Sequence, residues 1–245
     1  MRTGKTEILN VQFDNITLSE AVGRAAALLD APEGKGYVVT PNSEIVYLCR
    51  KEPQLARVLN GAILVLPDGV GVVHASKLLK RPLKEKVAGI DFAAALMEEL
   101  SRRGDGLFLL GAKPGVAEEA ARRLTRVYPN LKIAGTNDGY FKEDIPVIKK
   151  INRSGASVLF VCLGAPRQEY WMQGHMDQLN VRLAVGLGGS LDVFAGQVKR
   201  APDLWVKLGL EWLYRLICEP RRFGRMCRLP LFLFSAMGER IGGNH

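Results

Sequence analysis

Residues 158–168 read Val158-Leu159-Phe160-Val161-Cys162-Leu163-Gly164-Ala165-Pro166-Arg167-Gln168. The first part is an unbroken run of apolar, strand-forming residues, which is typical of a strand buried on both faces. The second part is a turn that contains glycine and proline and ends in two polar side chains. Strands that are apolar on both faces indicate a parallel sheet covered by helices, so this stretch predicts an α/β fold.

Similar apolar runs recur along the chain, and helical patterns separate them. They lie at residues 36–39, 62–66, 107–110 and 183–185. One helix is expected to begin at Thr17-Leu18-Ser19-Glu20, a capping-box pattern in which hydroxyl and carboxylate satisfy free backbone amides. The chain has 245 residues, of which 47% are hydrophobic, and this suits one main domain with an appendage. We therefore expect a mostly parallel sheet flanked by helices over residues 1–196.

Each expected strand is followed by a turn of small and polar residues. The turns are Thr40-Pro41-Asn42-Ser43, Pro67-Asp68-Gly69, Gly111-Ala112-Lys113-Pro114-Gly115, residues 162–168, and Gly186-Leu187-Gly188-Gly189-Ser190. Ligands of open α/β sheets bind outside the carboxyl ends of the strands, where helix N-termini direct free amides at anions. The turns are therefore expected to line one cleft, although each of them alone could be an ordinary turn.

Several common ligand sites are disfavoured by the sequence. No G-x-x-x-x-G-K-[ST] motif occurs, which argues against a P-loop ATPase. Residues 111–115 do not form G-x-G-x-x-G, and no ribose-binding acid follows the strand expected at residues 131–134, which argues against a dinucleotide oxidoreductase. The four cysteines show no C-x-x-C spacing and the three histidines are scattered. We therefore expect no disulfide, no metal site and no cofactor.

Residues 197–245 form an appendage that is both basic and aromatic. They hold nine basic and four acidic residues, a net charge of +5 out of the +9 of the chain. Such a segment suits an anionic lipid surface. Its apolar stretch, residues 229–237, contains Pro230 and is much shorter than the roughly 20 residues that span a bilayer. It could lie on a membrane but not cross one. The alternative is a solvated basic helix that packs on its own domain or on a second subunit.

Location, assembly and partners give further expectations. The first residues lack the apolar run of a secretory signal, so cytoplasmic residence is expected. Self-association could cover an exposed apolar tail, so a homo-oligomer is an open alternative. A pI near 9.5 with interleaved arginines and aromatics also fits a nucleic-acid-binding protein. Because the charge lies in one very hydrophobic segment and no nucleic-acid-binding motif occurs, no nucleic-acid partner is expected. A membrane scaffold without catalysis is a third alternative.

A set of motifs extends in order over nearly the whole chain. They are Thr40-Pro41-Asn42-Ser43-Glu44, Pro67-Asp68-Gly69-Val70-Gly71, Val87-Ala88-Gly89-Ile90-Asp91, residues 109–115, Gly139-Tyr140-Phe141, residues 164–169, residues 186–189, and Arg200-Ala201-Pro202 leading to Glu211-Trp212-Leu213-Tyr214-Arg215. In number and order they resemble the WecG/TagA/CpsF family of bacterial glycosyltransferases. The resemblance implies a Rossmann-like α/β core with a helical, membrane-associating C-terminal appendage.

The resemblance also implies a reaction. Members of that family transfer a sugar from a nucleotide donor to a lipid-linked acceptor at the inner face of the cell membrane. The teichoic-acid branch, which this chain resembles most, implies UDP-N-acetylmannosamine as donor and undecaprenyl-diphosphate-linked N-acetylglucosamine as acceptor. A β-linked product from an α-linked donor implies inversion at the anomeric carbon. Another UDP sugar, such as the uronic acid of N-acetylmannosamine or a hexose, is an alternative donor.

Such a transfer needs a base for the attacking hydroxyl. Asp68, at the end of a very apolar strand and in a family motif, is the candidate. Its alternative role is the N-cap of a helix that begins near Gly69. Thr40 and Asn42 follow a neighbouring strand and are expected to orient a sugar hydroxyl or acetamido group. They could equally belong to a plain turn.

The departing UDP needs positive charge or hydrogen-bond donors. No Asp-x-Asp motif for a metal occurs, so a metal-independent route is the hypothesis. Donor and phosphate contacts are expected from residues of the turns and motifs, namely Lys86, Gly111, Arg167, Gln168 and Gly188. Relatives often have arginine at the position of Lys86, so a point charge replaces a bidentate grip there. Gln168 could alternatively be a surface residue in the first turn of a helix.

The appendage is expected to serve both phosphate and lipid. Three arginines, Arg215, Arg222 and Arg225, are expected to contact phosphates. Leu229, Leu231, Phe232 and Phe234 are expected to enter the lipid interface. Because residues 197–245 contribute no expected strand, the core is expected to stay folded without them.

Overall fold

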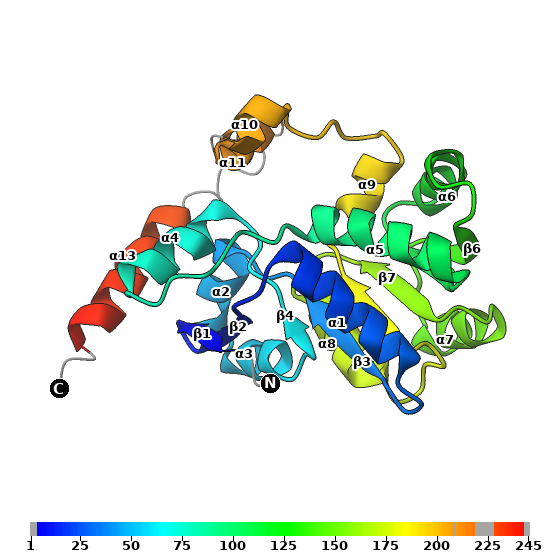
Figure 1. Cartoon of the computed structure of the whole chain (residues 1–245), viewed down its shortest axis with the longest axis horizontal. Helices are drawn as coiled ribbons and strands as arrows, with labels where there is room; N and C mark the ends of the chain where they lie inside the picture. The colour runs from blue at the N-terminus through cyan, green and yellow to red at the C-terminus, as the bar shows by residue number, and fades with distance from the viewer. Residues whose placement is uncertain (1–3, 208, 219–227, 243–245) are drawn as a thin grey trace.

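The computed structural model describes residues 4–207, 209–218 and 228–242. Its centre is a six-stranded sheet in the order β4-β3-β8-β7-β5-β6, with neighbouring strands parallel (Figure 1). The strands are β3 (Gly36–Val39), β4 (Leu64–Val65), β5 (Gly106–Gly111), β6 (Lys132–Asn137), β7 (Val158–Cys162) and β8 (Leu183–Gly186). Every strand expected from the sequence is present, so the predicted α/β class and parallel sheet are confirmed.

Helices cover both faces of the sheet (Figure 1). One face packs on α1 (Leu18–Asp30), α5 (Gly89–Arg103), α6 (Val116–Val127) and α9 (Ser190–Phe194). The opposite face packs on α2 (Ser43–Cys49), α3 (Pro53–Asn60), α4 (Val70–Leu78), α7 (Asp144–Arg153) and α8 (Arg167–His175). Successive strand residues alternate between the two cores, since Leu107 and Leu109 enter one while Phe108 and Leu110 enter the other. This alternation explains why the strands are apolar throughout.

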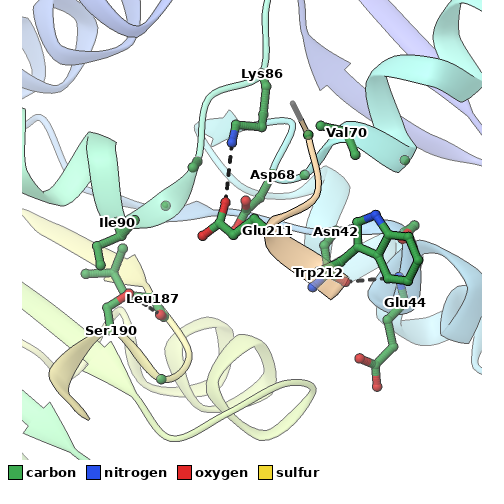
Figure 2. Close-up of a pocket in the computed structure, with 17 residues that line it drawn as sticks. Asn42, Glu44, Asp68, Val70, Lys86, Ile90, Leu187, Ser190, Glu211 and Trp212 are labelled. Atoms are coloured by element: carbon green, nitrogen blue, oxygen red, sulfur yellow. Dashed lines mark hydrogen bonds and ion pairs between the residues drawn. The ribbon is translucent and has the colours of Figure 1, made fainter. Parts of the chain in front are cut away.

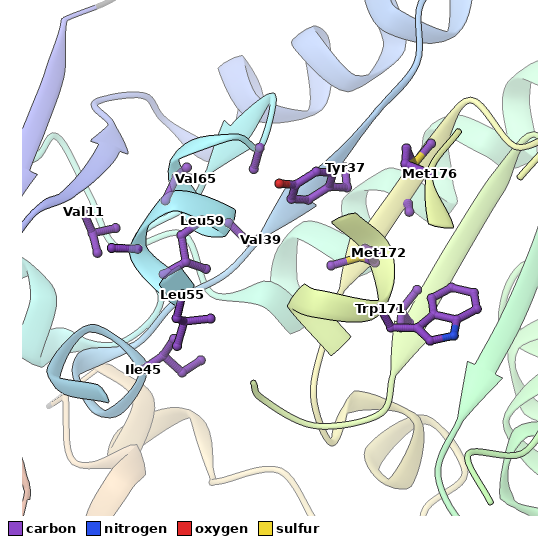
Figure 3. Close-up of a cluster of buried hydrophobic side chains, with 14 of the residues drawn as sticks. Val11, Tyr37, Val39, Ile45, Leu55, Leu59, Val65, Trp171, Met172 and Met176 are labelled. Carbon is purple, nitrogen blue, oxygen red and sulfur yellow. The ribbon is translucent and has the colours of Figure 1, made fainter. Parts of the chain in front are cut away.

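The second of these cores joins the sheet to α2, α3 and α8. Tyr37 and Val39 from β3 meet Leu55 and Leu59 from α3 and Met172 from α8 (Figure 3). These side chains are almost fully buried. Ile45 of α2 belongs to the same core, so this core holds α2 and α8, whose N-terminal ends lie next to the turns after β3 and β7.

The chain order reverses within the sheet. β4 lies outside β3 on one side, β6 lies outside β5 on the other, and β8 and β7 fill the centre. In open parallel sheets, ligands bind at the carboxyl edge where the order reverses. The turns that follow β3, β8 and β7 are therefore the expected centre of a binding region.

The capping box of α1 is confirmed. The Thr17 hydroxyl accepts a hydrogen bond from the Glu20 amide at 3.2 Å, and the Thr17 amide donates to Glu20 Oε2 at 2.7 Å. Lys84 adds a surface ion pair to the Glu20 carboxylate at 2.8 Å. These bonds fix the start of α1.

An N-terminal hairpin was not expected from the sequence. β1 (Lys5–Ile8) and β2 (Val11–Asp14) pair antiparallel in a separate two-stranded sheet. The Asp14 carboxylate is buried, accepts a hydrogen bond from the Val65 amide at 2.9 Å and pairs with Arg24 at 3.2 Å. The hairpin therefore supports β4, the short strand that precedes Asp68.

The appendage is helical in its described part and adds no strand there. It contains α10 (Asp203–Lys207), α11 (Glu211–Cys218) and α13 (Arg228–Gly242). Helix α13, red in Figure 1, packs against α2 and α4. Among the described residues, no helix is long and apolar enough to cross a bilayer.

The position of Phe232 corrects an expectation. Phe232 was expected in the lipid interface, but its side chain is fully buried in the core beside α2 and α4, together with Ala236. Leu231 and Phe234, by contrast, are 49% and 68% exposed. Helix α13 is therefore amphipathic, with one face completing the core and another exposed. The expectation that residues 1–196 keep an intact core without the appendage does not fit this packing.

Candidate active site

The turns at the carboxyl edge of the sheet line two pockets that share Gly189. The first, here called the Asp68 pocket, is bounded by the turns after β3, β4 and β8 and by residues of the appendage (Figure 2). The second, here called the Arg167 pocket, is bounded by the turns after β5, β6, β7 and β8. Gly189 lines both pockets. The turn after β8 is therefore the wall between them.

Asp68 lines the first pocket, three residues after the end of β4. Its backbone amide donates to the Pro41 carbonyl oxygen at 3.4 Å, which ties the β4 turn to the β3 turn. The N-cap residue of α4 is Gly69, at a φ of 91°. The alternative role of Asp68 as an N-cap is therefore not the one that it takes. Its carboxylate belongs to the pocket wall.

Asn42 also lines the Asp68 pocket, but part of its side chain is occupied. Its Oδ1 caps α2 by accepting hydrogen bonds from the Glu44 and Ile45 amides at 3.0 and 3.1 Å. The remaining polar group is the Nδ2 amide, which can only donate. A contact from Asn42 to a sugar would therefore be a hydrogen bond to a sugar oxygen.

Thr40 does not line either pocket. Its side chain is buried, and its hydroxyl donates to the Gly186 carbonyl oxygen at 2.9 Å. A side chain at Gly89 would collide with this hydroxyl, because a Cβ there would lie 2.9 Å from Thr40 Oγ1. The expected sugar contact of Thr40 is therefore corrected: the residue joins the ends of β3 and β8 beneath the pocket.

Lys86 lines the Asp68 pocket and connects the core with the appendage. Its Nζ lies 3.5 Å from Glu211 Oε2, and both side chains are about one-fifth exposed, at 20% and 19%. Figure 2 shows Lys86, Glu211 and Asp68 directed into the same region. Trp212 and Gly209 complete this side of the pocket. Glu211 and Trp212 were not among the predicted site residues, although both occur in a motif of the resemblance.

Arg167 lines the second pocket, as expected for a cation near a ligand. Its Nη1 donates to the Gly139 carbonyl oxygen at 2.9 Å, and its guanidinium lies 5.0 Å from the centroid of the Phe141 ring. These two contacts hold the side chain in one orientation. Lys113 lines the same pocket and adds a second positive charge.

Gln168 and the two predicted glycines have structural contacts. Gln168 is buried, which contradicts its alternative role as a surface residue, and it lines neither pocket. Its Nε2 donates to Glu169 Oε1 at 2.8 Å, and its Oε1 accepts from the Gly188 amide at 2.9 Å. Gly188 lines the Arg167 pocket. Gly111 lines neither, and a Cβ there would lie 2.3 Å from the Cys162 carbonyl oxygen. Direct phosphate contacts of Gln168 and Gly111 are therefore not supported.

A match to a known protein family covers the sheet, both pockets and the appendage. Residues 6–245 match the model of the glycosyl transferase WecG/TagA/CpsF family. The chain belongs to this family. It is therefore a glycosyltransferase, as the motifs predicted.

Three relatives carry the same name, N-acetylglucosaminyldiphosphoundecaprenol N-acetyl-beta-D-mannosaminyltransferase. The protein of Bacillus spizizenii is 39% identical over 209 residues, 85% of this chain and 81% of the relative. The protein of Bacillus subtilis is 38% identical over 202 residues, 82% of this chain and 79% of the relative. The protein of Staphylococcus aureus is 35% identical over 234 residues, 95% of this chain and 92% of the relative.

The arginines expected to contact phosphates are only partly described in this glycosyltransferase. Arg215 lies on α11, three residues after Trp212, which lines the Asp68 pocket. Arg222 and Arg225 lie outside the described residues, so their roles stay predictions. Leu229 belongs to α13, and its membrane role is likewise a prediction.

The cysteines and potential metal ligands of the glycosyltransferase were also located. Cys49 and Cys162 are free and buried, and burial raises the pKa of each thiol to about 12, so both are neutral. Both are therefore buried, unreactive thiols. Within the described residues, no group of three His, Cys, Asp or Glu side chains is arranged to hold a metal ion.

Proposed function

We propose that this glycosyltransferase transfers N-acetylmannosamine from UDP-N-acetylmannosamine to undecaprenyl-diphosphate-linked N-acetylglucosamine. Relatives at 35–39% identity carry this acceptor and this transferred sugar in their names. One observation on the chain itself carries the proposal: a carboxylate, Asp68, and a cation, Lys86, line the same pocket at the carboxyl edge of the sheet. Sugar transfer needs both a base for the attacking hydroxyl and positive charge near the departing phosphate.

The proposed step inverts the anomeric carbon. A hydroxyl of the acceptor sugar attacks the anomeric carbon from the side opposite to the phosphate, and Asp68 accepts the proton of that hydroxyl. As the new carbon–oxygen bond forms, the bond from the anomeric carbon to the phosphate oxygen breaks, and its electron pair leaves with UDP. An α-linked donor then gives a β-linked product.

The Arg167 pocket is the proposed place for the nucleotide. Arg167 and Lys113 offer two positive charges, and the Gly188–Gly189 wall adjoins the Asp68 pocket. A donor that binds there would direct its sugar across Gly189 toward Asp68. Lys86 is the proposed second cation for the departing phosphate, and its ion pair with Glu211 would then be exchanged for a pair with phosphate.

Transfer is expected to persist in excess EDTA. The sequence has no Asp-x-Asp motif, so protein cations and helix N-termini are proposed to stabilise the charge on UDP. The measurement is the initial rate with and without chelator, after exhaustive dialysis. A rate that falls in EDTA and returns with magnesium or manganese would contradict this prediction.

The appendage, residues 197–245, is proposed to complete the Asp68 pocket and to attach the enzyme to the inner face of the cell membrane. Gly209, Glu211 and Trp212 support the first role because they line the pocket. The exposed side chains of Leu231, Phe234 and Met237 support the second, since their spacing of three residues puts them along one side of α13. A second copy of the chain is the alternative occupant of this surface.

The function is tested by product mass. The full chain would be incubated with a short-chain diphosphate-linked N-acetylglucosamine lipid and, in parallel, with UDP-N-acetylmannosamine, its uronic acid, and UDP-N-acetylglucosamine. We expect one added N-acetylhexosamine with the first donor alone. A product with the uronic acid would replace the proposed donor, and no product with any donor would reject the proposed function. NMR of the disaccharide then establishes whether the linkage is β.

A further inference from the structure

Glu169 is a buried carboxyl group for which the proposed reaction has no use. It lies in the first turn of α8 and is 1% exposed. One carboxyl oxygen, Oε1, accepts a hydrogen bond from Gln168 Nε2 at 2.8 Å, while Oε2 is buried and has no hydrogen-bond partner within the described part of the chain. Burial raises the pKa of this carboxyl group. Buried acids without full hydrogen bonding are costly, which points to a specific role.

The contact with Glu169 determines which way the Gln168 amide faces. An amide side chain has one end that donates and one end that accepts. Because Nε2 is directed to Glu169, Oε1 is directed away from it and accepts the Gly188 amide at 2.9 Å. With the amide reversed, its Nε2 would face the Gly188 N–H, and that hydrogen bond would be lost. Glu169 therefore selects the orientation in which Gln168 holds Gly188.

Gly188 belongs to the wall between the two pockets. It has a φ of 54° and lines the Arg167 pocket, while the next residue, Gly189, lines both pockets. The end of β8, which leads into this turn, is packed tightly against α8, since a Cβ at Gly186 would lie 2.8 Å from Met172 Cε. Helix α8 therefore contacts both the end of β8, through Met172, and the wall itself, through Gln168.

We propose that Glu169 is a positioning residue: through Gln168 and Gly188 it fixes the turn after β8, and so the alignment of the two substrates on either side of Gly189. The inference rests on the proposed function only for its kinetic consequence. Its structural consequence, a turn held by Gln168, concerns the protein without substrate.

The first test compares Glu169→Gln with Glu169→Leu in the full chain. A glutamine at 169 keeps an acceptor for Gln168 Nε2, whereas leucine removes it at similar volume. We expect Glu169→Leu to speed hydrogen–deuterium exchange in residues 183–190, and to lower kcat by roughly 10- to 10²-fold, as for small misplacements of bound reactants. Glu169→Gln should keep most of the protection and of kcat.

A control separates positioning from general loss of stability. Met176→Ala removes a buried side chain just beyond α8 that belongs to the same core but not to this turn. It should lower the melting temperature while leaving kcat per folded molecule and the exchange of residues 183–190 unchanged. If Glu169→Leu behaves as this control does, or lowers kcat with the exchange unaltered, the positioning role is wrong.

A second pair of variants keeps the test decisive if Glu169→Leu does not fold. Gln168→Glu places two carboxyl groups side by side and removes the donor to Glu169, so turn protection should fall. With Glu169→Gln added, the amide at position 169 can donate to the carboxylate at position 168, which is the original hydrogen bond with its direction reversed. Protection of residues 183–190 should then return. Failure of the double variant to recover would overturn the inference. Because exchange needs no substrate, this result stands apart from the assay of the proposed function.

Discussion

Replacing Asp68 by asparagine should lower kcat by about 10²- to 10⁴-fold, the usual cost of losing a general base. The change keeps the size of the side chain but removes the group that accepts the proton. The fold should be preserved, because asparagine has nearly the same shape and the N-cap position of α4 belongs to Gly69. The measurement is steady-state turnover on a water-soluble, short-chain acceptor, with melting temperature as the check on folding.

Asp105→Asn is the matched control for this prediction. Asp105 precedes β5 and therefore lies at the amino edge of the sheet, where it pairs with Arg103 at 2.7 Å. Its replacement should alter stability slightly and leave kcat intact. A folded Asp68→Asn protein that turns over at the rate of the control would show that another group takes the proton.

Replacing Phe232 by alanine should lower the free energy of unfolding by about 3–5 kcal/mol, the range for emptying a buried phenylalanine site. The reason is its complete burial in the core beside α2 and α4. Phe234→Ala, two residues along the same helix, should change the free energy by no more than about 0.5 kcal/mol, because that side chain is 68% exposed. Urea denaturation of both variants measures the difference.

For binding to lipid, the order of importance of positions 232 and 234 should be reversed. Phe234→Glu should reduce sedimentation with anionic liposomes, since it removes an aromatic ring and adds a negative charge to the exposed side of α13. Phe232→Ala, at temperatures where it is folded, should bind as the wild type does. Equal losses of stability in the two variants, or unchanged liposome binding by Phe234→Glu, would show that the two faces of α13 are wrongly assigned.

The sheet could be predicted from the sequence because its signal is local. A strand covered on both sides must be apolar at every position, and Val158-Leu159-Phe160-Val161 meets that condition without reference to the rest of the chain. The hairpin β1–β2 gave a weaker signal. Its strands have four residues each, and polar residues, Thr6 in β1 and Asp14 in β2, occupy buried positions, which weakens the apolar pattern.

The roles of polar residues at the strand ends could not be derived in this way. A polar side chain after a strand predicts a ligand contact, but Thr40 bonds to Gly186 and Gln168 bonds to Gly188. These partners are 146 and 20 residues away in the chain, and only the fold brings them together. For the same reason the sequence of α13 could not reveal which aromatic side chain faces α2 and α4. That choice depends on a surface made by residues far from it.

If α13 attaches the enzyme to a membrane, as proposed above, its packing on α2 determines how far from the lipid the pocket lies. Helix α2 begins at Ser43, immediately after Asn42, which lines the Asp68 pocket. With α13 resting on the bilayer by its exposed side and fixed to α2 by its buried side, the height of the pocket above the lipid would be set by the fold. The enzyme would then select acceptors by distance from the bilayer. It would glycosylate sugars that their lipid anchor holds at that height, and it would not glycosylate sugars held closer to the bilayer or farther away.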